Sequence, residues 1–304
     1  MNDAALPRVI AGLGEILWDV FPEGPRFGGA PANFSCNVAG LAGKRAEVII
    51  VSGIGTDAPG TEALTRLQSH GVQTAYVQQS QFQTGRVEVL INDTGDASYE
   101  FADNTAWDNL EWSDSLKQTA RRTAAVCFGT LGQRASASRD VIRKYVAATR
   151  PGSLRVFDIN LRAPFWTADV VLESLPLANV LKCNEEELPV LGRLLNLQGT
   201  TASILDQIGR QFDYQVIALT RGPRGSVLWT PNAIDHIDGM KVNVADTVGA
   251  GDAFTAAIVL GILEKRPLDQ VHRHAAEVAA YVCSQTGATP HLPSKLQQAE
   301  QDPD

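Results

Sequence analysis

Six short apolar segments alternate with helix-like segments, and this alternation restricts the fold more than any other feature of the sequence. The apolar segments end mostly in Gly, Asp, Asn or Thr and occupy residues 8–15, 46–55, 124–132, 154–162, 179–184 and 215–222. Helical patterns occupy residues 61–71, 138–150, 170–178 and 203–212. Strands that alternate with helices form βαβ units, because parallel neighbours need a long crossover connection. We therefore predict an α/β fold whose mostly parallel sheet is covered by helices on both faces.

Length and composition set the broad class of the protein. The chain has 304 residues and 44% of them are hydrophobic, so a single domain spanning residues 1–304 can build a large core. A net charge of −8 argues against a nucleic-acid partner, which needs a basic face. No apolar run approaches the length of a membrane span, so no membrane contact is expected. The N-terminus lacks a basic signal region, and none of the four cysteines forms a C-x-x-C pair, so we expect a reducing, cytoplasmic location.

One region departs from the strand–helix alternation. Residues 84–91 and 98–104 alternate in hydrophobicity around a polar turn at Asp93–Asp96, which indicates a β-hairpin. Val72–Gln78 has strand character as well. The residues themselves leave two interpretations open: a lid that excludes water from a site, or an extension of the main sheet at its edge.

The stretch DTVGAGDAFTAA at residues 246–257 combines turn chemistry with the start of an apolar helix. Glycines before a helix allow a ligand to approach the free N–H groups and the positive end of the helix dipole. We therefore expect an anion hole at Gly249, Ala250 and Gly251. Asp252 has two interpretations: it caps the helix, or it accepts a proton from a hydroxyl that attacks a bound phosphate.

Two other glycine-containing segments resemble better-known phosphate-binding loops, but each departs from the motif at a required position. Gly40–Arg45 lacks the first glycine of a P-loop, and Arg45 stands where Ser or Thr must hold Mg²⁺. Gly53–Ala58 fits a loose dinucleotide pattern, but the next strand ends in Gln78 and Gln79 rather than in an acid for the ribose. These departures argue against a P-loop enzyme and against a dehydrogenase.

Several motifs resemble those of the ribokinase-like carbohydrate kinase family, and they occur in that family's order. Asp246–Asp252 is similar to its D-T-x-G-A-G-D signature, and Gly28–Phe34 resembles its G-G-x-x-x-N signature. Gly53–Gly60 resembles its G-x-D-x-x-G segment, Asn184–Glu187 its N-x-x-E motif, and Thr220–Gly225 its nucleotide loop. The resemblance covers nearly the whole chain.

The resemblance implies a three-layer α/β/α domain with a small β-sheet lid formed by segments near 15–27 and 72–104. It implies ATP-dependent phosphorylation of a sugar hydroxyl with Mg²⁺. In that reaction Asp252 would be the base, and the N–H groups of Gly249, Ala250 and Gly251 would stabilise the transferring phosphoryl group. A homodimer formed through the lid belongs to the same expectation.

The resemblance also assigns the nucleotide and metal sites. Glu187 would hold Mg²⁺ through water, with Asn184 beside it on the phosphates. Thr220, Gly222 and Gly225 would contact the nucleotide, together with Gly249 and Gly251. In relatives a monovalent cation such as K⁺ lies beside the anion hole, and the matching positions here are Asp246, Val248, Gln285, Gly287 and His291.

The sugar site follows from the same motifs. Asp19 would accept hydrogen bonds from a sugar diol, with Gly28, Gly29 and Asn33 completing the contacts. Relatives that act on phosphorylated sugars carry Lys after the paired glycines, whereas this chain has Ala30. The sequences GGAPANF at residues 28–34 and GEILWD at residues 14–19 are most similar to those of the fructokinase branch.

Alternatives to fructose stay open at this stage. Asn160 and Arg162 lie in the D-x-N-x-R segment, where an arginine can hold a carboxylate through two hydrogen bonds. That would suit 2-keto-3-deoxygluconate, the substrate of a sister branch. Tyr99 and Phe101 on the hairpin are expected to face the sugar. A catalytically silent sugar-binding regulator is the alternative from another class, although Asp252 is present.

Overall fold

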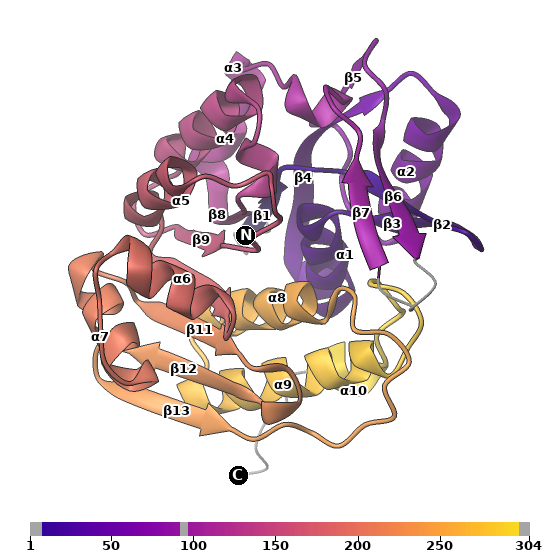
Figure 1. The fold of residues 1–304 in the computed structure, drawn as a ribbon. Coiled ribbons are helices and arrows are strands. Elements are labelled where there is room, and N and C mark those ends of the chain that lie inside the picture. The colour runs from indigo at the N-terminus through magenta and orange to yellow at the C-terminus, as the bar shows by residue number, and fades with distance from the viewer. Residues whose placement is uncertain (1–7, 92–96, 298–304) are drawn as a thin grey trace, which may run out of the picture.

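The computed structural model describes residues 8–91 and 97–297, and its centre is a nine-stranded sheet (Figure 1). The strand order is β13-β12-β11-β10-β9-β8-β1-β4-β5. All neighbours from β11 to β5 are parallel, and β12 and β13 extend the sheet in antiparallel fashion. The strands are β1 Arg8–Leu13, β4 Ala46–Gly55, β5 Val77–Ser80, β8 Thr123–Phe128, β9 Leu154–Asp158, β10 Val180–Asn184, β11 Val216–Thr220, β12 Ser226–Thr230 and β13 Ala233–Ile237.

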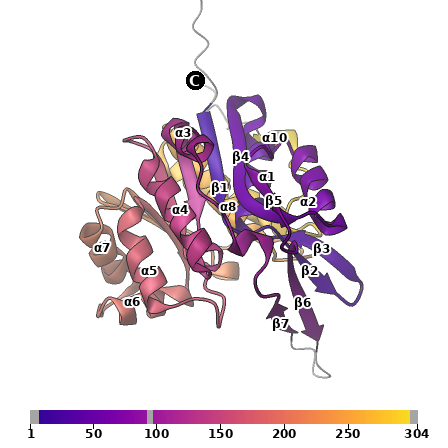
Figure 2. The same ribbon diagram turned by 90° about the horizontal axis from the view of Figure 1, so that it is seen from above.

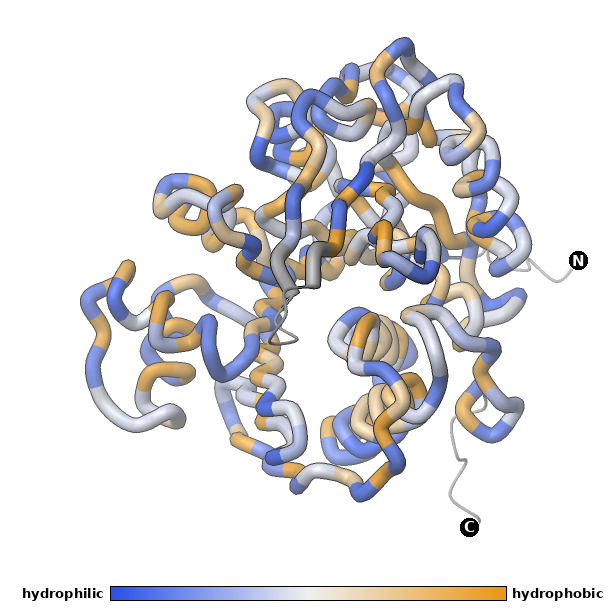
Figure 3. Tube along the Cα trace, turned by 45° about the vertical axis from the view of Figure 1, so that its right-hand side comes forward, coloured by the Kyte–Doolittle hydropathy of each residue, from blue (hydrophilic) through white to orange (hydrophobic). Residues whose placement is uncertain are grey.

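Helices cover both faces of this sheet, as Figure 2 shows from above. One layer contains α1 Ala30–Ala42, α2 Ala58–Ser69, α8 Ala250–Leu263, α9 Leu268–Cys283 and α10 Ser294–Gln297. The other contains α3 Asp114–Arg122, α4 Ser136–Ala148, α5 Ala168–Ser174, α6 Glu187–Leu194 and α7 Thr201–Gln211. The three-layer α/β/α prediction is therefore confirmed. Most outer helices alternate hydrophilic and hydrophobic residues along the chain, because only one face of each is buried (Figure 3).

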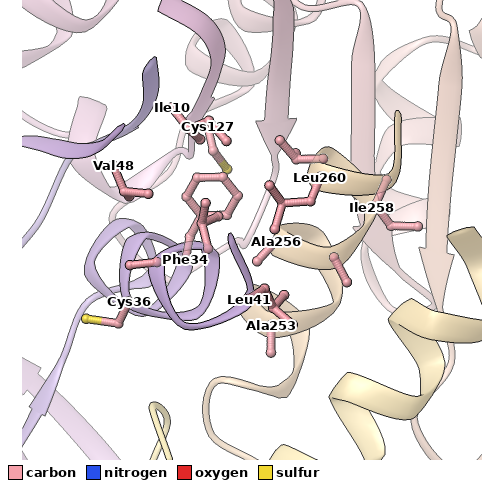
Figure 4. Close-up of a cluster of buried hydrophobic side chains, with 14 of the residues drawn as sticks. Ile10, Phe34, Cys36, Leu41, Val48, Cys127, Ala253, Ala256, Ile258 and Leu260 are labelled. Carbon is pink, nitrogen blue, oxygen red and sulfur yellow. The ribbon is translucent and has the colours of Figure 1, made fainter. Parts of the chain in front are cut away.

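Helix α8 differs from the outer helices because it is buried on nearly all sides. Nine consecutive residues, Ala253 to Gly261, are buried between α1 and α9. Small residues of α8 leave room for side chains of its neighbours. Phe34 of α1, for example, lies in the interior near Cys127 of β8 and Ala256 of α8 (Figure 4). An apolar helix in this position is rigid, so its N-terminal turn is a fixed point of the structure. No helix in the described part of the chain has the length and apolar character to span a bilayer.

A second sheet lies to one side of the main body, as Figures 1 and 2 show. Its order is β3-β2-β6-β7, with β2 Leu17–Phe21, β3 Gly24–Gly28, β6 Gly85–Ile91 and β7 Ala97–Phe101. The hairpin is therefore not an edge extension of the large sheet. The expected lid segment near 72–104 is too long, because β5 pairs with β4 at the edge of the large sheet. The turn at Asp93–Asp96 lies outside the described residues.

A buried histidine joins the antiparallel edge of the large sheet to the helical layer. His272 of α9 is fully buried and hydrogen-bonds Ser226 of β12 at 2.8 Å and Asp235 of β13 at 2.7 Å. The Ser226 side chain is buried as well, so neither its hydroxyl nor the His272 ring is accessible to a substrate. Burial lowers the pKa of His272, although the Asp235 carboxylate opposes the shift. The trio therefore acts as a cross-link between β12, β13 and α9.

Packing of α7 on β12 requires a glycine, which gives a test of the fold. A Cβ at Gly209 would lie 2.1 Å from the Trp229 ring, whereas one at Gly192 in α6 would meet its nearest atom at 3.5 Å. We expect Gly209→Ala to lower the free energy of unfolding by about 1–3 kcal/mol through overpacking. Gly192→Ala should be neutral or stabilising by about 0.5–1 kcal/mol, because Ala favours a helix over Gly. Equilibrium urea unfolding measures both, and a Gly209→Ala protein as stable as Gly192→Ala would contradict the described packing.

Candidate active site

The candidate site lies where the carboxyl ends of the central strands meet the N-termini of α1 and α8, which is the ligand position in open α/β sheets. A small cavity of about 20 Å³ marks its floor, enough for about one water molecule. Polar residues from distant parts of the chain line this cavity: Glu15, Thr130, Asp158, Asn160 and Asp252.

Asp252 lies in the first turn of α8 but does not cap the helix. The N-cap position belongs to Gly249, whose φ of 79° is left-handed, and no side chain caps the helix there. A Cβ at Gly249 would lie 2.5 Å from Ala288, so only glycine fits this turn. The capping interpretation of Asp252 is therefore wrong, because the helix begins at Ala250, two residues before the acid.

The Asp252 carboxylate is held toward the cavity. Its Oδ2 accepts a hydrogen bond from Asn33 Nδ2 of α1 at 2.9 Å. Burial, with the neighbouring Asp158 carboxylate, raises the pKa of Asp252 to about 7, while Lys182, the Asn33 hydrogen bond and Arg162 oppose the shift. A carboxyl group with a pKa near neutrality is suited to accept a proton during a reaction.

Glu15 is a second buried acid that the sequence analysis missed. It follows β1, is 4% exposed, and its Oε1 accepts a hydrogen bond from the backbone N–H of Ala30 at 3.2 Å. Burial raises the pKa of Glu15 to about 7; the Asp252 carboxylate adds to the shift, and backbone hydrogen bonds oppose it. An acid directly after an apolar strand and a glycine is the signal that could have identified Glu15 as a site residue.

A buried ion pair lies beneath the N-terminal turn of α8. Lys182 of β10 and Asp158 of β9 are directly opposite in the sheet, and their Nζ and Oδ1 atoms are 3.0 Å apart. The Thr255 hydroxyl of α8 lies 3.2 Å from the other Asp158 oxygen. Lys182 was also missed, because in the sequence it is one polar residue inside a strand that is otherwise apolar.

Of the residues expected to bind the sugar, only Asn160 and Asp252 are among those that line this cavity. Asp19 of β2 is half-buried, and a Cβ at Gly28 would lie 2.7 Å from its Oδ2, so that glycine leaves room for the carboxylate. Burial raises the pKa of Asp19 to about 6, against the charges of Arg162 and Arg26. Asn160 lines the cavity with a φ of 42°.

The two aromatic residues expected to contact the sugar, Phe101 and Tyr99, differ in how their side chains are surrounded. Phe101 of β7 shares a row of the small sheet with Val87 and Asp19, so its side chain is on the Asp19 face. It packs on Phe165 with ring centroids 4.9 Å apart. Tyr99 is 57% exposed.

The expected nucleotide residues lie at the ends of adjacent strands. Asn184 and Thr220 are directly opposite at the ends of β10 and β11. Asn184 and Glu187 bind each other's backbone: Asn184 Oδ1 accepts from Glu187 N at 2.9 Å, and Glu187 Oε2 accepts from Asn184 N at 2.8 Å. In the following loop Gly222 and Gly225 have φ values of 55° and 86°, and a Cβ at Gly225 would lie 1.9 Å from a carbonyl oxygen. Asn184, Glu187 and Thr220 therefore lie together at the carboxyl ends of β10 and β11.

Comparison with known proteins agrees with this arrangement. The family model of the pfkB family carbohydrate kinases matches residues 24–295. The chain belongs to this carbohydrate kinase family. Fructokinase of Escherichia coli is 27% identical over 316 residues, covering 93% of this chain and 95% of that protein.

Solved structures extend the comparison. A sugar kinase of Pyrococcus horikoshii in complex with ATP is 27% identical with a TM-score of 0.78, covering 92% of this chain and 94% of that chain. A 2-dehydro-3-deoxygluconokinase of Thermotoga maritima has a TM-score of 0.83 and covers 96% and 98%, but at 17% identity it supports the fold alone.

The donor set of this carbohydrate kinase fits a metal that arrives with phosphates. No group of three or more acidic, His or Cys side chains in the described residues could hold a metal by itself. Glu187 is a buried carboxylate at the start of α6, and burial raises its pKa. Mg²⁺ commonly binds through one or two carboxylates, waters and substrate phosphates, so Glu187 suits that mode.

The two segments expected to hold a monovalent cation are adjacent. Asp246 accepts hydrogen bonds from Val248 N at 3.0 Å and from Gly287 N at 3.3 Å. The Gln285 side chain instead donates to Ser284, and His291 is exposed and stacks on His70 with centroids 5.9 Å apart. Asp246, Val248 and Gly287 are therefore brought together, whereas the side chains of Gln285 and His291 point to other partners.

The raised pKa of Glu15 predicts a pH-dependent stability. Below about pH 4.5 the folded and unfolded states both hold the proton, but between about pH 4.5 and 7 the unfolded state ionises first, so stability is lost as the pH rises. Glu15→Gln keeps an acceptor for Ala30 and removes the ionisation. We expect it to raise the free energy of unfolding by about 1–3 kcal/mol at pH 8 and to change little at pH 4.5.

Chemical denaturation at the two pH values measures this effect. Glu23→Gln, at an exposed position of the small sheet, is the matched control and should change neither value. A Glu15→Gln protein that is less stable than the wild type at pH 8 would show that the Glu15 carboxylate is stabilised in the fold rather than strained by burial.

Proposed function

We propose that this carbohydrate kinase transfers the γ-phosphoryl group of ATP to fructose and forms fructose 6-phosphate. The observation that carries the proposal is the charge of the sugar site. Glu15 and Asp252 lie close enough for the charge of one to act on the other, and Arg162 is the cation whose charge acts on both of them and on Asp19. Carboxylates accept hydrogen bonds from hydroxyl groups, so this site suits a neutral polyol. Relatives named fructokinase, such as that of Escherichia coli, support the same substrate.

Asp252 is the proposed base. The sugar oxygen forms a bond to the γ-phosphorus, the bond from that phosphorus to the ADP oxygen breaks, and the hydroxyl proton passes to Asp252. Asn33 holds the acceptor oxygen of Asp252 in place through its 2.9 Å hydrogen bond. Because this transfer has a loose transition state, positioning contributes most of the catalysis and the base accepts the proton late.

The N-terminal turn of α8 is the proposed anion hole. The helix begins after Gly249, so the N–H groups of its first turn lack partners inside the helix; that of Ala250 makes one long hydrogen bond, 3.4 Å to Thr247 O. They are available to the transferring phosphoryl group, and the helix dipole adds positive potential at the same point. Glu187 would hold Mg²⁺ through water, and that ion would neutralise phosphate charge. Asp246, Val248 and Gly287 are the proposed site for K⁺.

The small sheet is the proposed lid. Asp19 and Phe101 lie on one face of this sheet, which we assign to the sugar, and Arg26 of β3 lies 3.7 Å from Asp246 in the loop before α8. This ion pair joins the lid to the loop that carries the anion hole. A closed lid would exclude water from the transferring phosphoryl group and so limit hydrolysis of ATP.

2-Keto-3-deoxygluconate is the second candidate substrate. Arg162 is exposed on the loop after β9 and could bind a carboxylate. The charge of this guanidinium already acts on three acids, so a sugar acid would compete with the protein's own carboxylates for it. A silent sugar-binding regulator has less support, because the base and the glycine turn are both in place.

A panel of sugars tests the proposed substrate. We expect the kcat/KM for fructose with ATP to exceed those for ribose, adenosine and 2-keto-3-deoxygluconate at least tenfold, equal to about 1.4 kcal/mol of transition-state binding. A coupled assay of ADP release measures each value, with sugar-free protein as the control for background hydrolysis. If 2-keto-3-deoxygluconate is the best substrate, the assignment moves to that sugar and Arg162 becomes its carboxylate ligand.

A further inference from the structure

The Asp158–Lys182 pair is placed where a charge would act on the reaction. Lys182 is 7% exposed and Asp158 is 4% exposed, so water screens neither side chain well. A Cβ at Gly251 would lie 3.1 Å from Lys182 Nζ. The ammonium therefore lies directly against the backbone of the proposed anion hole.

The surroundings of Lys182 are rich in acids. Burial opposes its charged form, but Asp158, Glu187 and Asp252 outweigh that effect and hold the pKa of Lys182 above its usual value. Lys182 therefore stays charged throughout the reaction. Of the two cations whose charges act on Asp252, Lys182 is buried and Arg162 is exposed.

A purely structural pair would not need this location. Replacing a buried ion pair by apolar residues is often neutral or stabilising, so the pair is weak evidence of a stabilising role. Here the pair is joined through Thr255 to the carbonyl of Gly251, with Oγ1–O 2.9 Å, and so to the glycine turn itself. The ammonium and the turn thus form one connected unit.

We propose that Lys182 is a positioning residue for phosphoryl transfer: its buried ammonium supports the anion hole from below and holds Asp252 ready to accept the proton. The proposal rests on the proposed kinase function. Asp158 has the opposite effect on Asp252. Its negative charge offsets that of the ammonium and repels the Asp252 carboxylate, so it raises the pKa that Lys182 lowers. The groups whose charges or hydrogen bonds act on Asp252 from the surrounding segments are Glu15, Asn33, Cys127, Asp158, Arg162 and Lys182.

Opposite charge changes in the pair distinguish this role from a structural one. Lys182→Met removes the cation and Asp158→Asn removes the anion, each with a side chain of similar size. We expect the acidic midpoint of the kcat–pH profile to move up by about one pH unit in Lys182→Met and down by a similar amount in Asp158→Asn. The direction follows from the charges, because a cation near Asp252 lowers its pKa and an anion raises it.

The double variant Asp158→Asn/Lys182→Met separates folding from catalysis. Each single variant leaves one buried charge unpaired and should lower Tm, whereas the double variant should recover Tm. Its kcat should stay at least tenfold below that of the wild type, because no cation remains under the anion hole. A double variant that recovers both Tm and kcat, with midpoints that do not move, would overturn the proposal.

A measurement without turnover keeps this test independent of the substrate. The Asp252 carboxyl carbon can be titrated by ¹³C NMR in sugar-free protein, with Asp252→Asn used to assign its signal. Its midpoint should move up in Lys182→Met and down in Asp158→Asn, as in the kcat–pH profile. Asp158→Asn suffices if Lys182→Met does not fold. If no sugar in the panel is phosphorylated but these shifts occur, the proposed function fails and the charge coupling stands. If fructose is phosphorylated and Asp158→Asn leaves the Asp252 midpoint unchanged, the inference about Lys182 fails alone.

Discussion

The N-terminal turn of α8 is the constraint on which the rest of the site depends. Four separate segments fix it: Asn33 of α1 holds Asp252, Asp158 of β9 contacts Thr255, Lys182 of β10 lies against Gly251, and Ala288 packs on Gly249. The buried apolar body of α8 then prevents the turn from moving as a unit. A parallel sheet with helices on both faces is what brings these segments to one edge. In the proposed function, this arrangement would pre-position backbone N–H groups and so reduce reorganisation during the reaction.

The charges at this edge oppose stability and favour chemistry. Burial raises the pKa of Glu15, Asp19 and Asp252, so each carboxylate costs folding free energy once it ionises. A protein selected only for stability would replace such groups with apolar residues of similar size. Their retention around a small polar cavity matches a site that binds hydroxyl groups and accepts one proton. Membership of the carbohydrate kinase family gives this arrangement its chemical purpose.

The local pattern of apolar and polar residues predicted most of the fold. The features it missed depend on contacts between segments that are far apart in the sequence. The six apolar segments all became strands of the large sheet, because each is a short run with a polar or glycine end. The sequence did not show that β5 pairs with β4, because a strand at this place in the chain can pair with the edge of either sheet. Motifs identified Asp252 and the glycine turn, but Lys182 became visible only through the register that places it opposite Asp158. Glu15 was missed for a similar reason: its burial depends on α1, which follows it by two strands.

The turnover of Asp252→Asn tests the central claim most directly. Asn keeps the size of the side chain and an oxygen that can face Asn33, but it cannot take the hydroxyl proton. The account predicts a fall in kcat of roughly 10²–10⁴, with no loss of Tm and with ATP binding near that of the wild type. A well-folded Asp252→Asn protein that retains more than about a tenth of the wild-type kcat, short of the range for a general base, would contradict it. The turn of α8 would then be a phosphate-binding element without a base.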